Sequence, residues 1–184
     1  MLCPVCRNHD LKPIELEPDL KVASCDGCSG AWLAKDDYDA WQALHPEEPP
    51  ATTAPVEIQV GEIAKAKLCP QCNHLMVKYR IGHGLGFFID HCNSCGGFWL
   101  DGNEWPALKL RGLHHNLDDV LSSRWQKDVR QQEIQEKLDE VYIRQLGRET
   151  YDKMREIRVW LDGQPNRSMI LAYLAESRAE VQKA

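Results

Sequence analysis

The cysteines of this 184-residue chain constrain its fold more than any other feature, because all eight stand in Cys-x-x-Cys pairs. Two thiolates at this spacing can face one small ion, and a second pair can complete the site after a β-hairpin brings the chain back. The pairs occur in two such sets along the chain. The sequence therefore predicts two four-cysteine sites, one formed by Cys3, Cys6, Cys25 and Cys28 and the other by Cys69, Cys72, Cys92 and Cys95.

Structural zinc is the predicted occupant of both sites, which gives two Zn²⁺ per chain. Four thiolates at ~2.3 Å close the tetrahedron and leave no coordination position for substrate or water. Ribbons this small lack a sufficient core, and zinc contributes roughly 10–16 kcal/mol to the folding of finger peptides. A lone iron and a thiol redox switch are the alternatives. Neither explains why the pairs come twice with matched spacing.

Histidines near the predicted sites are surplus to four thiolates. His74 and His91 stand next to or close to ligand cysteines, and His114 and His115 form a doublet. We expect these side chains to support the sites from outside the coordination shell or to lie on the surface.

The metal-binding half contains an internal repeat. Aligning Cys3 with Cys69 gives an offset of 66, whereas aligning Cys25 with Cys92 gives 67, so the second hairpin has one extra residue. Trp32 then falls on Trp99. Each copy is predicted to be a β-hairpin followed by a short helix. The predicted strands are residues 13–16, 20–23, 75–81 and 87–91, and the first short helix spans residues 36–44.

The C-terminal part of the chain has the apolar periodicity of helices. Apolar residues recur every three or four positions from Leu117 onward. Gly147 and the Asp162–Pro165 stretch interrupt this pattern, which predicts helices over about residues 117–146, 148–161 and 166–181. We expect the apolar stripes to pack on one another or on the second ribbon. The alternative is that one long stripe is a surface for a partner.

The predicted fold class is a small α+β protein with two tandem four-cysteine zinc ribbons and a C-terminal all-α region. Residues 1–45 form the first ribbon and residues 65–112 the second. Residues 46–64 contain four prolines and are predicted to be a linker. The helical C-terminal region comprises residues 113–184.

The net negative charge of the chain lies in the metal-binding half. Residues 1–104 carry 8 Lys and Arg against 15 Asp and Glu, whereas residues 105–184 carry 14 against 13. Thiolates bound to zinc make the first half still more acidic, so it is a poor match for a phosphate backbone. The N-terminus has no signal-peptide pattern, and no apolar run approaches the ~20 residues of a membrane span. A reducing, cytoplasmic location and no membrane partner are therefore expected.

The second repeat resembles the bacterial transcription-factor-IIB-type zinc-ribbon family. That family has the signature CPxC, then a hairpin, then CxxCGGxWLDxxE, and this chain has Cys69-Pro70-Gln71-Cys72 followed by Cys92-Asn93-Ser94-Cys95-Gly96-Gly97-Phe98-Trp99-Leu100-Asp101-Gly102-Asn103-Glu104. The first repeat is a diverged copy, with Ser29 at the first glycine and Ala34 at the aspartate. The family name implies a role in transcription. Residues 105–184 are not covered by the resemblance.

Three functions are compatible with these features. The first is a non-enzymatic protein-interaction or adaptor module that binds another protein or self-associates through its helical tail. In this hypothesis the ribbons display aromatic side chains, namely Trp32, Trp41, Phe98, Trp99 and Trp105. For Trp32 and Trp99, however, we expect burial. The second is binding of nucleic acid or RNA polymerase, for which Lys65, Lys67 and their neighbours are candidates and which the acidic half disfavours. The third is a zinc–thiol redox sensor or chaperone. No catalytic constellation occurs, so no enzymatic activity is expected.

Overall fold

The computed structural model describes residues 1–45, 65–82 and 84–176. The predicted linker, residues 46–64, lies outside this range, as do residues 177–184 at the end of the third predicted helix. The chain divides into two compact units, Met1–Gln131 and Gln132–Ala184. Each unit is described by itself below.

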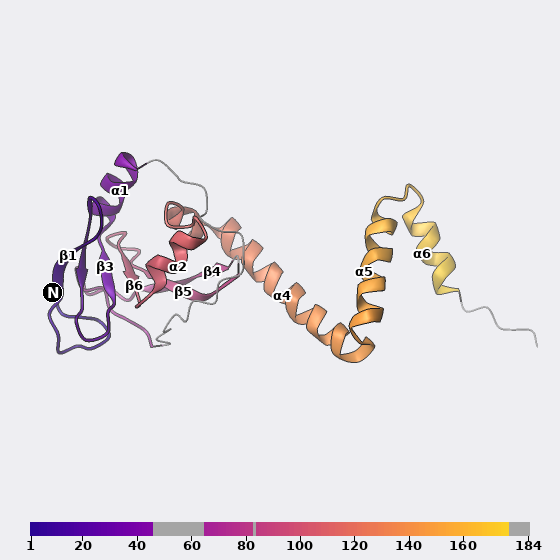
Figure 1. Ribbon diagram of the computed structural model, residues 1–184, viewed down its shortest axis with the longest axis horizontal. Coiled ribbons are helices and arrows are strands. Elements are labelled where there is room, and N and C mark those ends of the chain that lie inside the picture. The colour runs from indigo at the N-terminus through magenta and orange to yellow at the C-terminus, as the bar shows by residue number, and fades with distance from the viewer. Residues whose placement is uncertain (46–64, 83, 177–184) are drawn as a thin grey trace, which may run out of the picture. The chain divides into compact units, whose positions relative to one another are not determined.

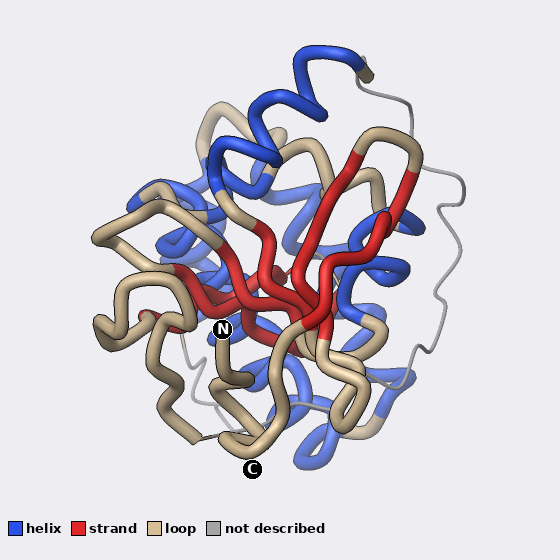
Figure 2. The backbone as a smooth tube through the Cα atoms, turned by 90° about the vertical axis from the view of Figure 1, so that its left-hand side faces the viewer, coloured by secondary structure: helices blue, strands red, loops and turns tan. Residues whose placement is uncertain are grey.

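A single antiparallel sheet of six strands organises the N-terminal unit, in the order β1-β2-β3-β6-β5-β4 (Figure 1 and Figure 2). The first ribbon contributes three neighbouring strands and the second ribbon the other three. The strands are β1 (Lys12–Glu17), β2 (Leu20–Ser24), β3 (Ala31–Leu33), β4 (Val77–Gly82), β5 (Leu85–His91) and β6 (Phe98–Leu100). The α+β class and the tandem ribbons are confirmed. The sequence reasoning missed β3 and β6, because three residues are too few to show a period of two.

The two ribbons are joined where β3 pairs with β6. Trp32 lies opposite Trp99 in this ladder. Each tryptophan also covers a glycine of the other ribbon: a Cβ built on Gly97 would lie 2.3 Å from the Trp32 ring, and one on Gly30 would lie 2.3 Å from the Trp99 ring. Only glycine permits so close an approach. The glycine and the tryptophan of the Gly-x-Trp segment in each repeat therefore form the packing contact between the two ribbons.

Alternation along β3 and β6 separates two clusters of buried residues, one on each face of the sheet. Trp32 and Trp99 join the cluster that contains the cysteines. Their strand neighbours Leu33, Phe98 and Leu100 belong to the larger apolar core. Strands β2, β4 and β5 and the helices α1 (Lys35–Leu44), α2 (Glu104–Leu110) and α3 (Leu117–Val120) supply most of the rest of that core.

The aromatic residues considered as a display surface are buried instead. Trp32, Trp41, Phe98, Trp99 and Trp105 are all at most 4% exposed. The hypothesis that they are displayed is therefore wrong, and the expectation that Trp32 and Trp99 are buried is right. The apolar surface of five large rings is more strongly stabilised in the core than in water.

The start of α4 (Ser123–Leu146) closes the outer edge of β4. The Gln126 side-chain amide donates to the Arg80 carbonyl at 2.9 Å, and its carbonyl accepts from the Arg80 backbone N–H at 3.2 Å. The Trp125 indole donates to the Ile81 carbonyl at 2.9 Å. The Gln126 amide thus bonds the backbone N–H and carbonyl of this edge strand, as a further strand would otherwise do.

The C-terminal unit contains the end of α4, α5 (Arg148–Asp162) and α6 (Arg167–Ala175). Gly147, with φ 80°, separates α4 from α5. The helix predicted from residue 117 is two helices, because the chain turns between Val120 and Ser123. None of the helices in the described part of the chain combines the length and the apolar character needed to span a bilayer.

Replacing Gly30 or Gly97 by alanine is predicted to destabilise the joined sheet. The new methyl group overlaps a buried indole ring, and overpacking of this kind costs about 1–3 kcal/mol. Denaturant unfolding of the zinc-loaded protein measures the loss. Gly86→Ala is the matched control, because its added methyl group meets open space. Equal stability of all three variants would contradict the reciprocal packing.

Candidate metal centres and the groove between them

The structure brings each predicted set of four cysteines together. Within each cluster all four Sγ atoms lie within 4.8 Å of one another. In the first cluster, two Sγ–Sγ distances are 3.6 and 3.8 Å, and in the second cluster three such distances are 3.4, 3.5 and 3.7 Å. A tetrahedron with metal–sulfur bonds of ~2.3 Å has edges of about 3.8 Å, whereas a disulfide would need about 2.05 Å. The clusters fit two structural Zn²⁺ ions.

A tight turn in each Cys-x-x-Cys pair directs both sulfur atoms toward the middle of their four-cysteine cluster. The residue after the second cysteine of each pair has a left-handed backbone, with φ of 62° at Arg7, 57° at Ser29, 61° at Asn73 and 76° at Gly96. Its N–H donates back to the carbonyl of the first cysteine, at 2.8–2.9 Å in all four turns. Glycine adopts this conformation without strain, which explains the family's glycine at Gly96. Ser29 carries that strain in the first ribbon.

Backbone N–H groups within these turns also stabilise the thiolates that zinc requires. Burial raises the pKa of the Cys92 thiol, but hydrogen bonds from the backbone N–H groups of Cys95 and Ser94 lower it to about 7. Burial likewise acts to raise the pKa of Cys25, and the backbone N–H groups of Cys28 and Gly27 again lower it below its usual value. The two repeats thus share the electrostatics of their second Cys-x-x-Cys turn.

The described histidines near these centres stay outside both cysteine clusters. His91 is 8% exposed, and its Nδ1 lies 2.9 Å from the Asn93 side-chain oxygen. His115 stacks on Trp41, with ring centroids 4.6 Å apart. These contacts fit packing and support of the ribbon.

A buried ionic cluster lies beside the second zinc centre. The Lys67 ammonium donates to Asp90 at 2.5 Å and to Asp101 at 2.8 Å, and all three side chains are at most 3% exposed. The Trp99 indole donates to the other Asp101 oxygen at 2.8 Å. Asp101 thus links the tryptophan of the signature to the lysine that precedes Cys69, which accounts for the Trp-Leu-Asp part of the motif.

Glu104, the last residue of the motif, accepts a hydrogen bond from the backbone of Asp101. Its Oε2 accepts the Asp101 backbone N–H at 2.8 Å, as in one half of a capping box. Asn103 is the N-cap residue of α2 but makes no side-chain cap. Glu104 is 1% exposed, and burial, followed by the nearby charge of Asp101, raises its pKa to about 8. At neutral pH its carboxyl group is therefore mostly protonated.

Sequence reasoning placed Lys67 among surface basic residues, and this assignment is wrong. The side chain is 1% exposed and is held between two carboxylates. A lysine two residues before a ligand cysteine has no sequence pattern that distinguishes it from a surface lysine.

The first ribbon has Ala34 at the position of the signature aspartate, and there the Trp32 indole donates across to Gln71 of the second ribbon at 3.3 Å.

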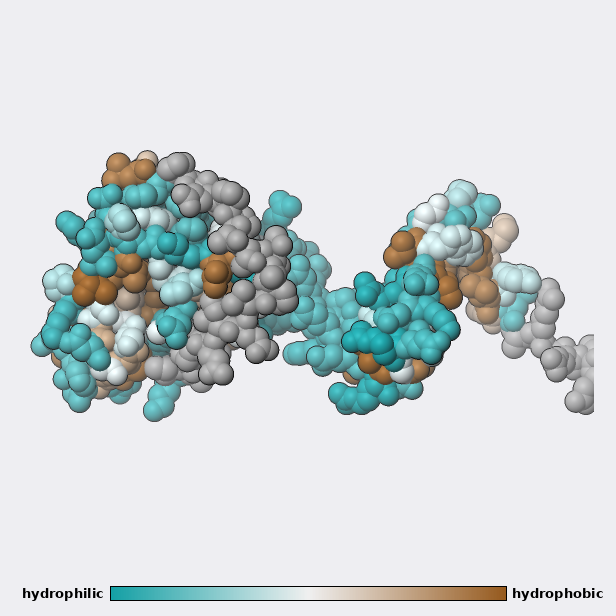
Figure 3. All heavy atoms as spheres, in the orientation of Figure 1, coloured by the Kyte–Doolittle hydropathy of each residue, from teal (hydrophilic) through white to brown (hydrophobic). Residues whose placement is uncertain are grey.

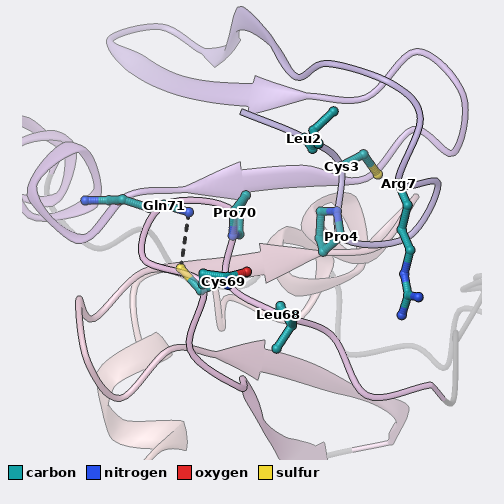
Figure 4. A pocket seen from close by; sticks show the side chains of 9 residues that line it. Leu2, Cys3, Pro4, Arg7, Leu68, Cys69, Pro70 and Gln71 are labelled. Carbon is teal, nitrogen blue, oxygen red and sulfur yellow. Dashed lines mark hydrogen bonds between the residues drawn. The ribbon is translucent and has the colours of Figure 1, made fainter.

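A groove of about 470 Å³ lies between the first Cys-x-x-Cys turns of the two ribbons. We call it the knuckle groove. Its lining consists of residues at equivalent positions of the repeat: Leu2 and Leu68, Cys3 and Cys69, Pro4 and Pro70, Arg7 and Asn73, with Gln71 in addition (Figure 4). Leu2 is 58% and Leu68 47% exposed. Joining the ribbons therefore creates an apolar hollow that neither ribbon has alone.

Lys67→Met is predicted to destabilise the second ribbon by about 3–5 kcal/mol, because it leaves two buried carboxylates without their cation. Thermal and denaturant unfolding of the zinc-loaded protein measures this loss. Lys65→Met is the control, since the Lys65 side chain is exposed. A loss as small as that of the control would show that the cluster contributes little to stability.

Glu104→Gln is predicted to change how stability depends on pH. The folded-state pKa of Glu104 is raised to about 8, so the folded protein binds the proton more tightly than the unfolded chain. Wild-type stability therefore falls as pH rises toward about 8, whereas glutamine stays neutral. The unfolding free energy of the variant relative to wild type should rise from about pH 5, just above the ordinary carboxyl pKa of 4.5, to about pH 8 and then level off. A constant difference over this range would contradict the protonated carboxyl group.

Comparison with known families matches both ribbons. Residues 2–43 and residues 68–111 each match the transcription factor zinc-finger family, of the zinc-ribbon type found in transcription factor IIB. Neither the curated proteins nor the solved structures contain a significant match to the chain. The matched segments coincide with the two four-cysteine clusters and with the three strands that each ribbon contributes to the single sheet. The two ribbons, which make up just under half of the chain, are therefore similar to the transcription factor zinc-finger family.

Proposed function

We propose that the protein is a non-enzymatic adaptor whose knuckle groove binds an extended segment of a partner protein. The observation that carries this proposal is the apolar lining of the groove, in which Leu2 and Leu68 are about half exposed and face a common hollow. Exposed leucines that flank a concave apolar surface are typical of docking sites. The closed four-cysteine centres on either side suit a structural role rather than catalysis.

The walls of the groove are held rigidly before any partner arrives. Cys3 and Cys69 are fixed by their clusters and are at most 2% exposed. Gln71 is held by the indole of Trp32 from the other ribbon. Because little side-chain freedom remains to be lost on binding, more of the contact energy contributes to affinity.

Charge at the rim indicates what the bound segment carries. Arg7 lies at one end of the groove (Figure 4) and also lines an adjoining hollow of about 210 Å³ together with Lys65. These cations favour a carboxylate next to the apolar anchor. The proposed ligand is therefore a peptide segment with large apolar side chains beside Asp or Glu.

Nucleic acid is less well supported as a partner. Of the basic residues around the second hairpin, Lys67 is buried in its ion cluster, and Lys78 lies 3.6 Å from Asp90. Arg80 lies over the Phe88 ring at 4.9 Å. The metal-binding half is also strongly acidic, which opposes binding to phosphates.

Peptide display on the full zinc-loaded chain tests the proposal. We expect enrichment of segments that pair apolar residues with Asp or Glu, and at least a tenfold loss of affinity in the double variant Leu2→Ser/Leu68→Ser. The matched control is Ile14→Ser/Val77→Ser, which removes one exposed apolar residue from each ribbon outside the groove. Absence of any enriched segment, or equal losses in both variants, would contradict binding in the groove.

A further inference from the structure

The C-terminal unit buries very little of its own apolar surface. In its described part, residues 132–176, only Tyr151 and Leu161 are buried. Thirteen large apolar side chains there are at least 40% exposed: Ile134, Leu138, Val141, Tyr142 and Leu146 on α4, Met154, Ile157, Val159 and Trp160 on α5, and Met169, Leu171, Tyr173 and Leu174 on α6. Figure 3 shows brown apolar residues gathered on α5 and α6. Helices of this length are marginal in water without a packed apolar face.

The exposed residues on α4 and α5 form seams rather than scattered points. Ile134, Leu138 and Val141 follow one another at intervals of four and three. On α5, Met154 and Ile157 stand three apart and are exposed, and the next position of the same row, Leu161, is itself buried. Alternation of this kind keeps the side chains on one face of a helix and is the spacing of helices that pack against other helices. We call these two rows the α4–α5 seams.

A polar group lies where α4 meets α5. The pKa of Asp139 on α4 is lowered, first by the hydrogen bond from Gln135 at 2.7 Å and then by the nearby Tyr151 hydroxyl on α5. Apart from Leu161, the residues of the apolar seams remain exposed. The hairpin thus has a defined local connection but lacks an apolar partner among the residues that the structure describes.

We propose that a second copy of this chain covers the α4–α5 seams, so that the protein is a homodimer joined through its C-terminal unit. The exposed apolar side chains of the unit other than Val159, those of α6 included, offer on the order of 100 Å² each. Together they reach the about 800 Å² per partner of a stable interface. The two buried residues in its described part give this unit little apolar packing of its own, and an identical chain is a partner that is always present in equal amount.

Charge supports an identical partner. Residues 132–184 carry 9 Lys and Arg against 10 Asp and Glu, so two copies meet with almost no net repulsion. Residues 1–131 carry 13 against 18, and they become more acidic with zinc-bound thiolates. Like-charge repulsion thus keeps the ribbons of two chains apart but does not oppose pairing of the helices. Two-fold pairing would give a closed assembly, in which each seam contacts its own copy.

Self-association does not depend on the proposed function of the groove, but a dimer would change how strongly some partners bind. A dimer presents two knuckle grooves, so a partner with two binding segments gains avidity without any new contact. Loss of the dimer leaves single-site peptide affinity unchanged. Loss of the groove leaves the dimer unchanged.

Sedimentation equilibrium of the full zinc-loaded chain tests the proposal, with the chain mass of 21.1 kDa as reference. We expect twice this mass for the wild type at micromolar concentration. Ile157→Glu and Leu138→Glu should each weaken association at least a hundredfold, because a charge enters the apolar interface. Val159→Glu is the matched control: Val159 is 75% exposed and lies about 200° around α5 from Ile157.

The wild-type mass decides the proposal even if a seam variant loses its helices. A single-chain mass at about 100 µM overturns it, and so does an assembly larger than two chains. Dissociation by Val159→Glu to the same degree as by Ile157→Glu also overturns it. Circular dichroism should show C-terminal helicity that falls on dilution, in step with dissociation.

Discussion

Antiparallel pairing of β3 with β6 is the contact on which the N-terminal unit depends. Three residue pairs connect two ribbons that are separated by more than sixty residues in the repeat. The pairing is closed by reciprocal packing, in which Trp32 covers Gly97 and Trp99 covers Gly30. Each ribbon alone would expose β3 or β6 as a free edge, which is a site for unwanted pairing. Tandem repetition removes both inner edges within one chain.

Joining the ribbons has consequences on both faces of the sheet. On one face, helices from both repeats share a single apolar core. On the other face, the two zinc clusters and the two tryptophans form one continuous buried group. The knuckle groove also arises there, because its lining comes in equivalent pairs from the two repeats. The proposed binding surface is thus a product of the pseudo-symmetry of the unit.

The two ribbons are stabilised by different interactions beside the same metal chemistry. Ribbon 2 places Lys67 between two buried aspartates, and Asp101 in turn fixes the Trp99 indole. Ribbon 1 has Ala34 at the aspartate position, and its tryptophan instead bonds to Gln71 of the other ribbon. The diverged repeat therefore relies on its neighbour for a contact that the second repeat makes internally. This dependence is a physical reason for the two copies to stay in one chain.

The zinc sites could be read from the sequence because local spacing alone determines them. A Cys-x-x-Cys turn places two sulfur atoms on one ion whatever surrounds it, and two matched turns complete a tetrahedron. The same holds for the hairpins of β1 with β2 and of β4 with β5, which have alternating residues and turn signals. Repetition likewise predicted that Trp32 and Trp99 play equivalent roles.

Tertiary structure alone decided the features that depend on contacts between distant residues. The sequence does not show that Lys67 is buried, because only the approach of Asp90 and Asp101 compensates its charge. Nor does it show that β3 and β6 pair, since strands of three residues acquire their identity from a neighbour across the sheet. The apolar periodicity after Leu117 has the same appearance throughout. Packing divides it into a part that anchors α3 and the start of α4 on ribbon 2 and a part, from Ile134 onward, that is left exposed.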